Sequence, residues 1–113
     1  MEAKETFERN LQTVVNDLEK IAENRDRGGL LDYLHDALEV EIKTDSEGRF
    51  VGAEVLFMSG GPTVWLDTQE GAVMASWNGF PTTSRELPEE TNDFIDDVIL
   101  EYVFKRRLKN DYL

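Results

Sequence analysis

The spacing of apolar residues changes twice along this chain of 113 residues. The spacing is helical, near 3.6 residues, up to about residue 38. It is two residues, as in strands, from there to about residue 77, and it is helical again after residue 88. Helices that flank a run of strands are typical of an α+β domain with an antiparallel sheet. The length suits one core, so we interpret residues 1–113 as a single domain.

Residues 1–27 are predicted to form the N-terminal helix and a linker. The helical stripe recurs at spacings of four and three residues, at Phe7, Leu11, Val14, Leu18 and Ile21. Gly28 and Gly29 are expected to end this helix, because glycine readily adopts the left-handed conformation of a helix C-terminus. A second, short helix is predicted from the leucines at positions 30, 31, 34 and 38.

Residues 28–84 are predicted to hold this short helix and a four-stranded antiparallel meander. Two similar turn motifs, Asp45-Ser46-Glu47-Gly48 and Thr68-Gln69-Glu70-Gly71, are typical of three-residue hairpin loops. The expected strands cover residues 38–44, 49–58, 63–68 and 72–77. Asn78-Gly79 is typical of a tight turn, and residues 80–84 are predicted to be irregular chain or a brief edge strand.

The turns also predict which side chains share a face of the sheet. One face should collect Val40, Ile42, Phe50, Leu56, Met58, Trp65, Val73, Ala75 and Trp77. The other should collect Val51, Ala53, Val55, Phe57, Val64, Leu66 and Met74. Both faces are apolar at the centre, so we expect both to be covered, by helices on each side or by a partner chain. Glu54 is a charge in the middle of the second strand and should reach an edge or find a partner.

Residues 85–113 are predicted to form one long C-terminal helix and a frayed tail. Pro88 suits a first helical turn, and basic residues from 105 to 109 suit the last one. The apolar stripe is broad, so we expect this helix to be the most buried of the three. The complete predicted order is α-α-β-β-β-β-α.

The net charge of −12 is unevenly distributed. Residues 28–101 carry sixteen acidic and three basic side chains, whereas residues 102–113 carry a net charge of +3. A strongly acidic field repels nucleic acid and anionic membranes and attracts basic proteins. We therefore expect no direct nucleic-acid binding. No stretch reaches the length of an apolar membrane span, and the N-terminus does not resemble a signal peptide, so we expect a cytoplasmic protein with no membrane association.

Motifs that would carry chemistry are weak in this sequence. The chain has no cysteine, and its one histidine, His35, lies between two aspartates without a nucleophile at a typical spacing. Asp45-Ser46-Glu47-Gly48 lacks the alternating ligands of a calcium loop, and Ser59-Gly60-Gly61-Pro62 lacks the lysine of a phosphate loop. We predict no catalytic, cofactor-binding or metal-binding residue, and hence a protein that is not an enzyme.

Two groups of residues are candidates for binding a partner. Aromatic side chains often anchor protein interfaces, and Trp65, Trp77 and Phe80 are candidates of this kind. Acidic side chains of the last helix form the second group, Asp93, Asp96, Asp97 and Glu101. Core packing of the tryptophans and a solvated acidic face are the simpler interpretations.

These observations favour a non-enzymatic protein–protein interaction module whose partner is another protein, either a basic one or a second copy in a homodimer. The first alternative is an inhibitor from a phage or mobile element that mimics nucleic acid, which would require carboxylates spaced like phosphates. The second alternative is a small-molecule-binding domain or enzyme with a pocket between sheet and helix. Trp65, Trp77 or Glu54 would line that pocket.

Overall fold

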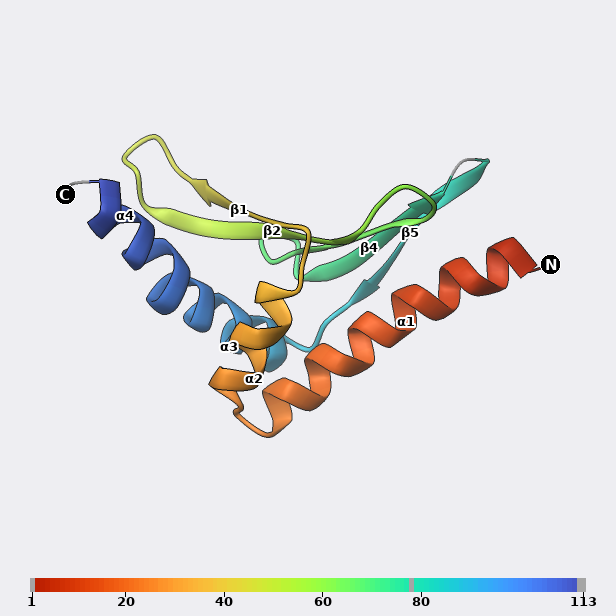
Figure 1. Ribbon diagram of the computed structural model, residues 1–113, viewed down its shortest axis with the longest axis horizontal. Helices are drawn as coiled ribbons and strands as arrows, with labels where there is room; N and C mark the ends of the chain where they lie inside the picture. The colour runs from red at the N-terminus through yellow and green to blue at the C-terminus, as the bar shows by residue number, and fades with distance from the viewer. Residues whose placement is uncertain (1, 78, 112–113) are drawn as a thin grey trace.

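The computed structural model describes residues 2–77 and 79–111 (Figure 1). The helices before the sheet are α1 (Glu2–Glu23) and α2 (Arg27–His35). The strands are β1 (Glu39–Thr44), β2 (Phe50–Met58), β3 (Thr63–Asp67), β4 (Ala72–Trp77) and β5 (Phe80–Glu86). The chain ends in α3 (Glu89–Ile99), a π-helical turn η1 (Leu100–Phe104) and α4 (Lys105–Asp111). The α+β class is confirmed.

The strands form one antiparallel sheet in the order β1-β2-β3-β4-β5, so the meander is confirmed. The predicted number of four strands is wrong, because β5 is a full strand of seven residues. Its sequence is polar and contains Pro81, which is tolerated because β5 lies at the edge of the sheet. This composition is why the pattern of apolar residues did not reveal the strand.

The junction of α1 and α2 differs from the prediction in its glycines. Arg25 takes the left-handed conformation, with φ of 51°, and Asp26 caps α2 by accepting a hydrogen bond of 2.8 Å from the Gly29 amide. Gly28 and Gly29 therefore lie in the first turn of α2 and do not end α1. A Cβ atom at Gly29 would collide with the Asp26 carboxylate, so glycine permits this cap.

Two details of the hairpins change which side chains share a face. Thr44 pairs with Phe50 but Lys43 pairs with Gly52, so Val51 is the additional residue of a β-bulge. In the second hairpin, Asp67 pairs with Ala72 and leaves a loop of four residues where three were predicted. In each of these two hairpins the pairing is therefore shifted by one residue from the prediction, which places the second strand's side chains on the opposite face.

The actual pairs place apolar residues opposite each other on one face. Val40 lies opposite Val55, Ile42 opposite Ala53, Leu66 opposite Val73 and Val64 opposite Ala75. The structure places all of α1, α2, α3 and α4 on this side of the sheet (Figure 1). We call it the covered face and the opposite side the open face. Of the two predicted ways of covering both faces, helices on each side do not occur in the described residues, whereas covering by a partner chain stays a prediction.

The core lies between the covered face and the helices. Helix α1 contributes Phe7, Leu11, Val14, Val15 and Leu18, and α3 contributes Phe94, Ile95, Val98 and Ile99. These side chains are the apolar stripes predicted from the sequence. They pack on the buried residues of β2, β3 and β4 and account for the orientation of both helices.

The C-terminal helix is continuous in direction from α3 through η1 to α4 (Figure 1). Burial ends at Ile99, and no residue of η1 is buried. The prediction that this helix is the most buried therefore holds only for its first part. The ring of Phe104 lies 5.6 Å from the ring of Phe50, beneath the β1–β2 hairpin. The predicted frayed tail includes residues 112–113, which lie outside the described residues.

Candidate functional site

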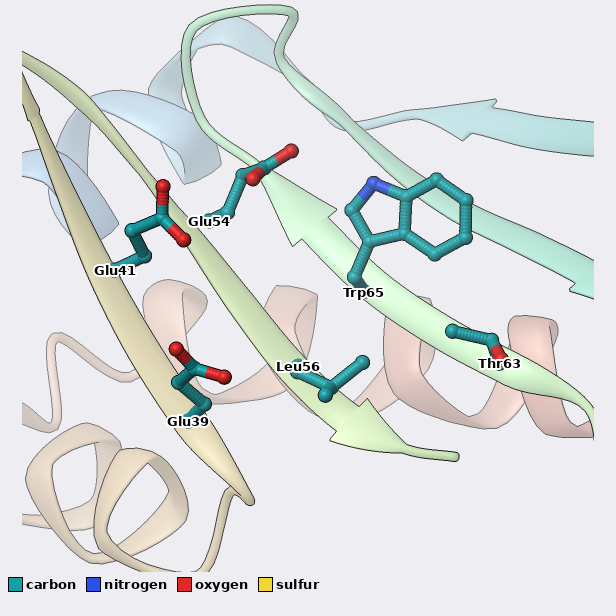
Figure 2. A pocket seen from close by; sticks show the side chains of 6 residues that line it. All are labelled: Glu39, Glu41, Glu54, Leu56, Thr63 and Trp65. Atoms are coloured by element: carbon teal, nitrogen blue, oxygen red, sulfur yellow. The ribbon is translucent and has the colours of Figure 1, made fainter. Parts of the chain in front are cut away.

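The open face of the sheet is the candidate site, and Figure 2 shows its central part from the side away from the helices. Side chains alternate along each strand, so residues between the buried ones point away from the core. Hydrogen-bonded neighbours on adjacent strands then align into rows that cross the sheet. Two such rows define the face.

The first row is acidic. Glu41 of β1 pairs with Glu54 of β2, Glu54 pairs with Asp67 of β3, and beyond Ala72 the row ends at Glu86 of β5. We call these four carboxylates the acidic row. Like charges directly opposite one another on a sheet are destabilising, so packing alone does not explain this arrangement.

The second row is apolar. On each strand it lies two residues from the acidic row. Leu56 pairs with Trp65, and Trp65 pairs with Met74. We call these three residues the apolar row, and all of them are half-buried. Glu39 occupies the β1 end of this row, opposite Leu56.

A hollow of about 270 Å³ lies where the two rows meet. Figure 2 shows Glu39 and Glu41 on β1 at one side of it, Glu54 and Leu56 on β2, and Trp65 and Thr63 on β3 at the other side. The hollow therefore presents three carboxylates beside an indole and an aliphatic side chain. Such a lining suits a cation with an apolar stem, because the charged head meets carboxylates and the stem meets apolar surface.

Lys43 partly neutralises the acidic row. Its ammonium nitrogen lies 3.2 Å from a carboxylate oxygen of Asp67 and 3.8 Å from one of Glu54. Burial lowers the pKa of Lys43, but Asp67, Glu54 and Glu41 outweigh this effect and raise it above its usual value. Lys43 therefore stays charged at neutral pH, and Glu54 has the partner that its position in the sheet requires.

Asp67 is the buried end of this ion pair. Its side chain accepts hydrogen bonds from the amides of Gln69 and Glu70, at 3.0 and 3.1 Å, and so also closes the β3–β4 loop. Only 7% of Asp67 is exposed. One carboxylate oxygen thus accepts the hydrogen bonds of the loop, and the other pairs with Lys43. This ion pair holds the ammonium group of Lys43 beside the acidic row.

The structure separates the predicted aromatic candidates. Trp65 lies on the open face, whereas Trp77 and Phe80 belong to the covered side. The ring of Phe80 stacks on that of Phe7 of α1 at 6.2 Å, and the ring of Trp77 lies 6.4 Å from that of Phe80. The prediction that Trp65 and Trp77 share a face is wrong, because the four-residue β3–β4 loop shifts the register.

The predicted acidic candidates lie on the C-terminal helix, on the covered side of the sheet (Figure 1). Asp93 and Asp97 are exposed, and Glu101 pairs with Lys105 at 3.0 Å. Asp96 is half-buried. Burial raises its pKa, the charges of Asp93 and Asp97 add to the rise, and the Thr68 hydroxyl opposes it. The structure therefore does not bring these four acids together with Trp65.

Sequence reasoning did not single out Glu39, Glu41, Lys43, Leu56, Asp67 or Met74 as site residues. A signal for three of them was present, because Glu39, Glu41 and Lys43 alternate with Val40 and Ile42. That alternation indicates charges on one face of the first strand. Their neighbours across the sheet depend on the bulge at Val51, which no turn motif indicates.

Two kinds of feature in the described residues bear on metal and membrane binding, groups that could hold a metal ion and helices that could cross a membrane. In residues 2–77 and 79–111, no group of three or more histidine, aspartate or glutamate side chains is placed to hold a metal ion. No helix in the same part of the chain has the length and apolar content that crossing a bilayer requires.

A second hollow, of about 250 Å³, lies between α1, α2 and β2 beside Tyr33 and Phe57. The Tyr33 hydroxyl donates a hydrogen bond of 2.9 Å to Asp17, and burial together with this carboxylate raises its pKa. The predicted pocket residues Trp65, Trp77 and Glu54 do not line this hollow. Tyr33 therefore joins α2 to α1 through its hydrogen bond to Asp17.

Comparison of the chain with protein-family models, with curated proteins and with solved structures gives no significant match.

Proposed function

We propose that the protein is a non-enzymatic interaction module whose open face binds a basic segment of a partner protein. A lysine or arginine side chain of the partner occupies the hollow. Its charged head lies among Glu39, Glu41 and Glu54, and its stem lies on Leu56 and Trp65. The observation that supports this proposal is the acidic row beside the half-exposed apolar row, on a face that none of the described helices covers.

The arrangement favours a cation for an electrostatic reason. Five carboxylates, the four of the acidic row and Glu39, share this face with one ammonium group, that of Lys43. A second cation relieves the repulsion between Glu41 and Glu54, which face each other directly. A bound lysine or arginine side chain both relieves this repulsion and contacts the indole of Trp65. We therefore expect the hollow to select lysine and arginine over neutral residues.

The expected affinity is modest. Exposed ion pairs contribute about 0.2–1 kcal/mol each, and a cation over an indole contributes about 0.5–2 kcal/mol. With three carboxylates and one indole these contributions sum to about 1–5 kcal/mol, so a single lysine side chain binds with a dissociation constant of about 1 mM or weaker. A segment that presents several basic residues along the acidic row binds more tightly, because its later contacts form within one complex.

The nucleic-acid mimic is less well supported by the positions of the acids. A mimic needs one continuous stripe of carboxylates that follows a phosphate backbone. The acidic row lies on the open face, whereas Asp93, Asp97 and Glu101 lie on the helix that packs against the other side. The sheet separates the two groups.

The test uses the intrinsic fluorescence of Trp65 in a Trp77→Phe background. We expect hexalysine and hexaarginine peptides to change the emission of Trp65 in a saturable way at low salt. Binding should weaken at least tenfold between about 20 and 300 mM salt, because the charges are exposed and screened. A hexaserine peptide should have no effect.

The variant Glu41→Gln/Glu54→Gln should weaken hexalysine binding about tenfold. Its matched control is Glu89→Gln/Glu90→Gln, which removes the same two charges from exposed positions at the start of α3. The control should change the affinity less than twofold. Equal weakening by both variants would show that net charge alone attracts the peptide, and the proposal would then be wrong.

A further inference from the structure

The two edges of the sheet differ in what lies beneath them. Below β5 the helix α1 is in place, as the stacked rings of Phe7 and Phe80 show. Below β1 there is instead a groove of about 540 Å³ between α2 and the C-terminal helix. Its lining combines apolar with charged side chains: Leu31, Leu34, Val40, Val103, Asp32, His35, Arg106 and Arg107.

The edge at β1 also collects exposed apolar surface. Among the described residues, three large hydrophobic side chains are exposed, and two of them lie next to β1 in the sequence or in the sheet. Leu38 is 62% exposed just before β1, Val51 is 38% exposed at the bulge opposite the end of β1, and Leu108 is 37% exposed on α4. Apolar surface beside a strand edge with unpaired backbone groups is typical of a site where another strand binds.

The sequence of β1 is self-complementary when two copies run antiparallel. Centred on Ile42, such pairing places Glu41 of each copy opposite Lys43 of the other. Opposite charges that face each other across a sheet favour the pairing, and Glu41 of the second copy then competes with Asp67 for the Lys43 ammonium. Parallel pairing would place like charges together, so the pattern selects the antiparallel arrangement.

In this antiparallel arrangement of two copies, the helices beside β1 carry opposite charges. Helix α2 leads into the start of β1, whereas Phe104, one residue before α4, lies under Phe50 near the end of β1. Within one chain α2 and α4 line the two sides of the groove, and a twofold axis through Ile42 would bring α2 of one copy to α4 of the other as well. Helix α2 and the residue after it present the exposed acids Asp32 and Asp36, and α4 presents the exposed bases Arg106 and Arg107.

We propose that the edge of β1 and the groove below it bind a second copy of this chain, forming a dimer with one continuous antiparallel sheet. This inference goes beyond binding of a basic partner and uses the sheet edge and the groove below it, which share Glu41 with the hollow on the open face. The two open faces then lie side by side, with the β1 ends of both acidic rows next to the twofold axis. Such a dimer presents two hollows to one partner.

The test is a charge exchange between two variants, followed by sedimentation velocity from about 1 to 200 µM. The unmodified protein should dimerise within this range. Asp32→Arg/Asp36→Arg places bases against bases, and Arg106→Asp/Arg107→Asp places acids against acids. Each variant alone should raise the dimer dissociation constant at least tenfold. Because all four side chains are exposed, both variants should keep the circular dichroism spectrum of the folded protein.

An equimolar mixture of the two variants should form a heterodimer about as tightly as the unmodified protein. In that heterodimer both contacts between α2 and α4 again join opposite charges. A monomeric unmodified protein at 200 µM would overturn the proposal. A dimer that both variants leave unchanged, or a mixture that does not recover, would overturn this interface. Binding of hexalysine to the open face is independent of these outcomes, so the two proposals fail separately.

Discussion

The two tryptophans lie on opposite sides of one sheet and have different surroundings. Trp77 packs beside Phe80 and the covered core, whereas Trp65 lies between Leu56 and Met74 next to the acidic row. The same strands thus supply a closed core on one side and a charged, partly apolar surface on the other. Both indoles are half-buried, so the two tryptophans differ in their neighbours and not in their exposure.

Truncation of one leucine on each face should give the largest contrast. Leu66 is fully buried on the covered face, so Leu66→Ala should cost about 2–5 kcal/mol of unfolding free energy. Leu56 on the open face is half-exposed, so Leu56→Ala should cost less than about 1 kcal/mol. Urea unfolding measures both. Equal losses would mean that the open face is covered in solution.

The bulge at Val51 shifts the register of β2, and the stability of the protein should be sensitive to a single methyl group added next to it. A Cβ atom at Gly52 would lie 3.1 Å from the backbone nitrogen of Gln69 and 3.0 Å from its Cβ. Gly52→Ala should therefore destabilise the protein by about 1–3 kcal/mol. Gly61→Ala is the matched control, since nothing lies within 4 Å of its Cβ position, and it should stay within about 0.5 kcal/mol. A neutral Gly52→Ala would contradict the close approach at the bulge.

Removal of Lys43 tests the charge balance of the open face. Lys43→Met leaves the buried Asp67 carboxylate without its cation and should cost about 1 kcal/mol at neutral pH. The control Lys105→Met breaks an exposed pair with Glu101 and should cost almost nothing.

The pKa of Lys43 is raised in the folded protein, so its contribution is present below the unfolded value near 10.5. It is lost as the pH rises through the folded pKa. If Lys43→Met leaves the thermal midpoint unchanged at pH 7, this ion pair does not support the sheet.

The smallest expected effect on stability comes from Asp96 on the covered side. Removal of its charge should stabilise the protein, whereas the changes above destabilise it. Burial raises the pKa of Asp96, so the folded state binds a proton that the unfolded state has released. Its ionisation therefore lowers stability as the pH rises from about 3.8 through the folded pKa.

Asp96→Asn should stabilise the protein at pH 7 by at most about 1 kcal/mol, because half of the carboxyl remains screened by solvent. The gain should disappear below pH 3. Thermal unfolding from pH 3 to 7 measures it, with the exposed Asp93→Asn as a smaller control. A variant that is less stable at pH 7 would show that ionised Asp96 supports the fold.

Periodicity predicted the helices and the first four strands well, because Phe7 to Ile21 and Phe94 to Ile99 form regular stripes against one core. It missed β5, whose stability comes from pairing with β4 and from Phe80 on α1, and not from an apolar pattern. Of the candidate site, Trp65 was identified as a residue for partner binding, and Glu54 only as a charge in need of a partner or as part of a pocket wall. The bulge at Val51 and the four-residue loop after Asp67 decide which side chains join it, and both depend on contacts between hairpins that a turn motif does not encode.

The most direct test of the open face as a protein-binding surface is a ¹⁵N–¹H correlation spectrum during titration with hexalysine. We expect the indole N–H signal of Trp65 to shift together with the amides of Glu41, Glu54 and Leu56. The indole N–H signal of Trp77 should stay in place and so serves as an internal control. Shifts at Trp77, shifts spread evenly over α1 and α3, or no shift at millimolar peptide would contradict the account.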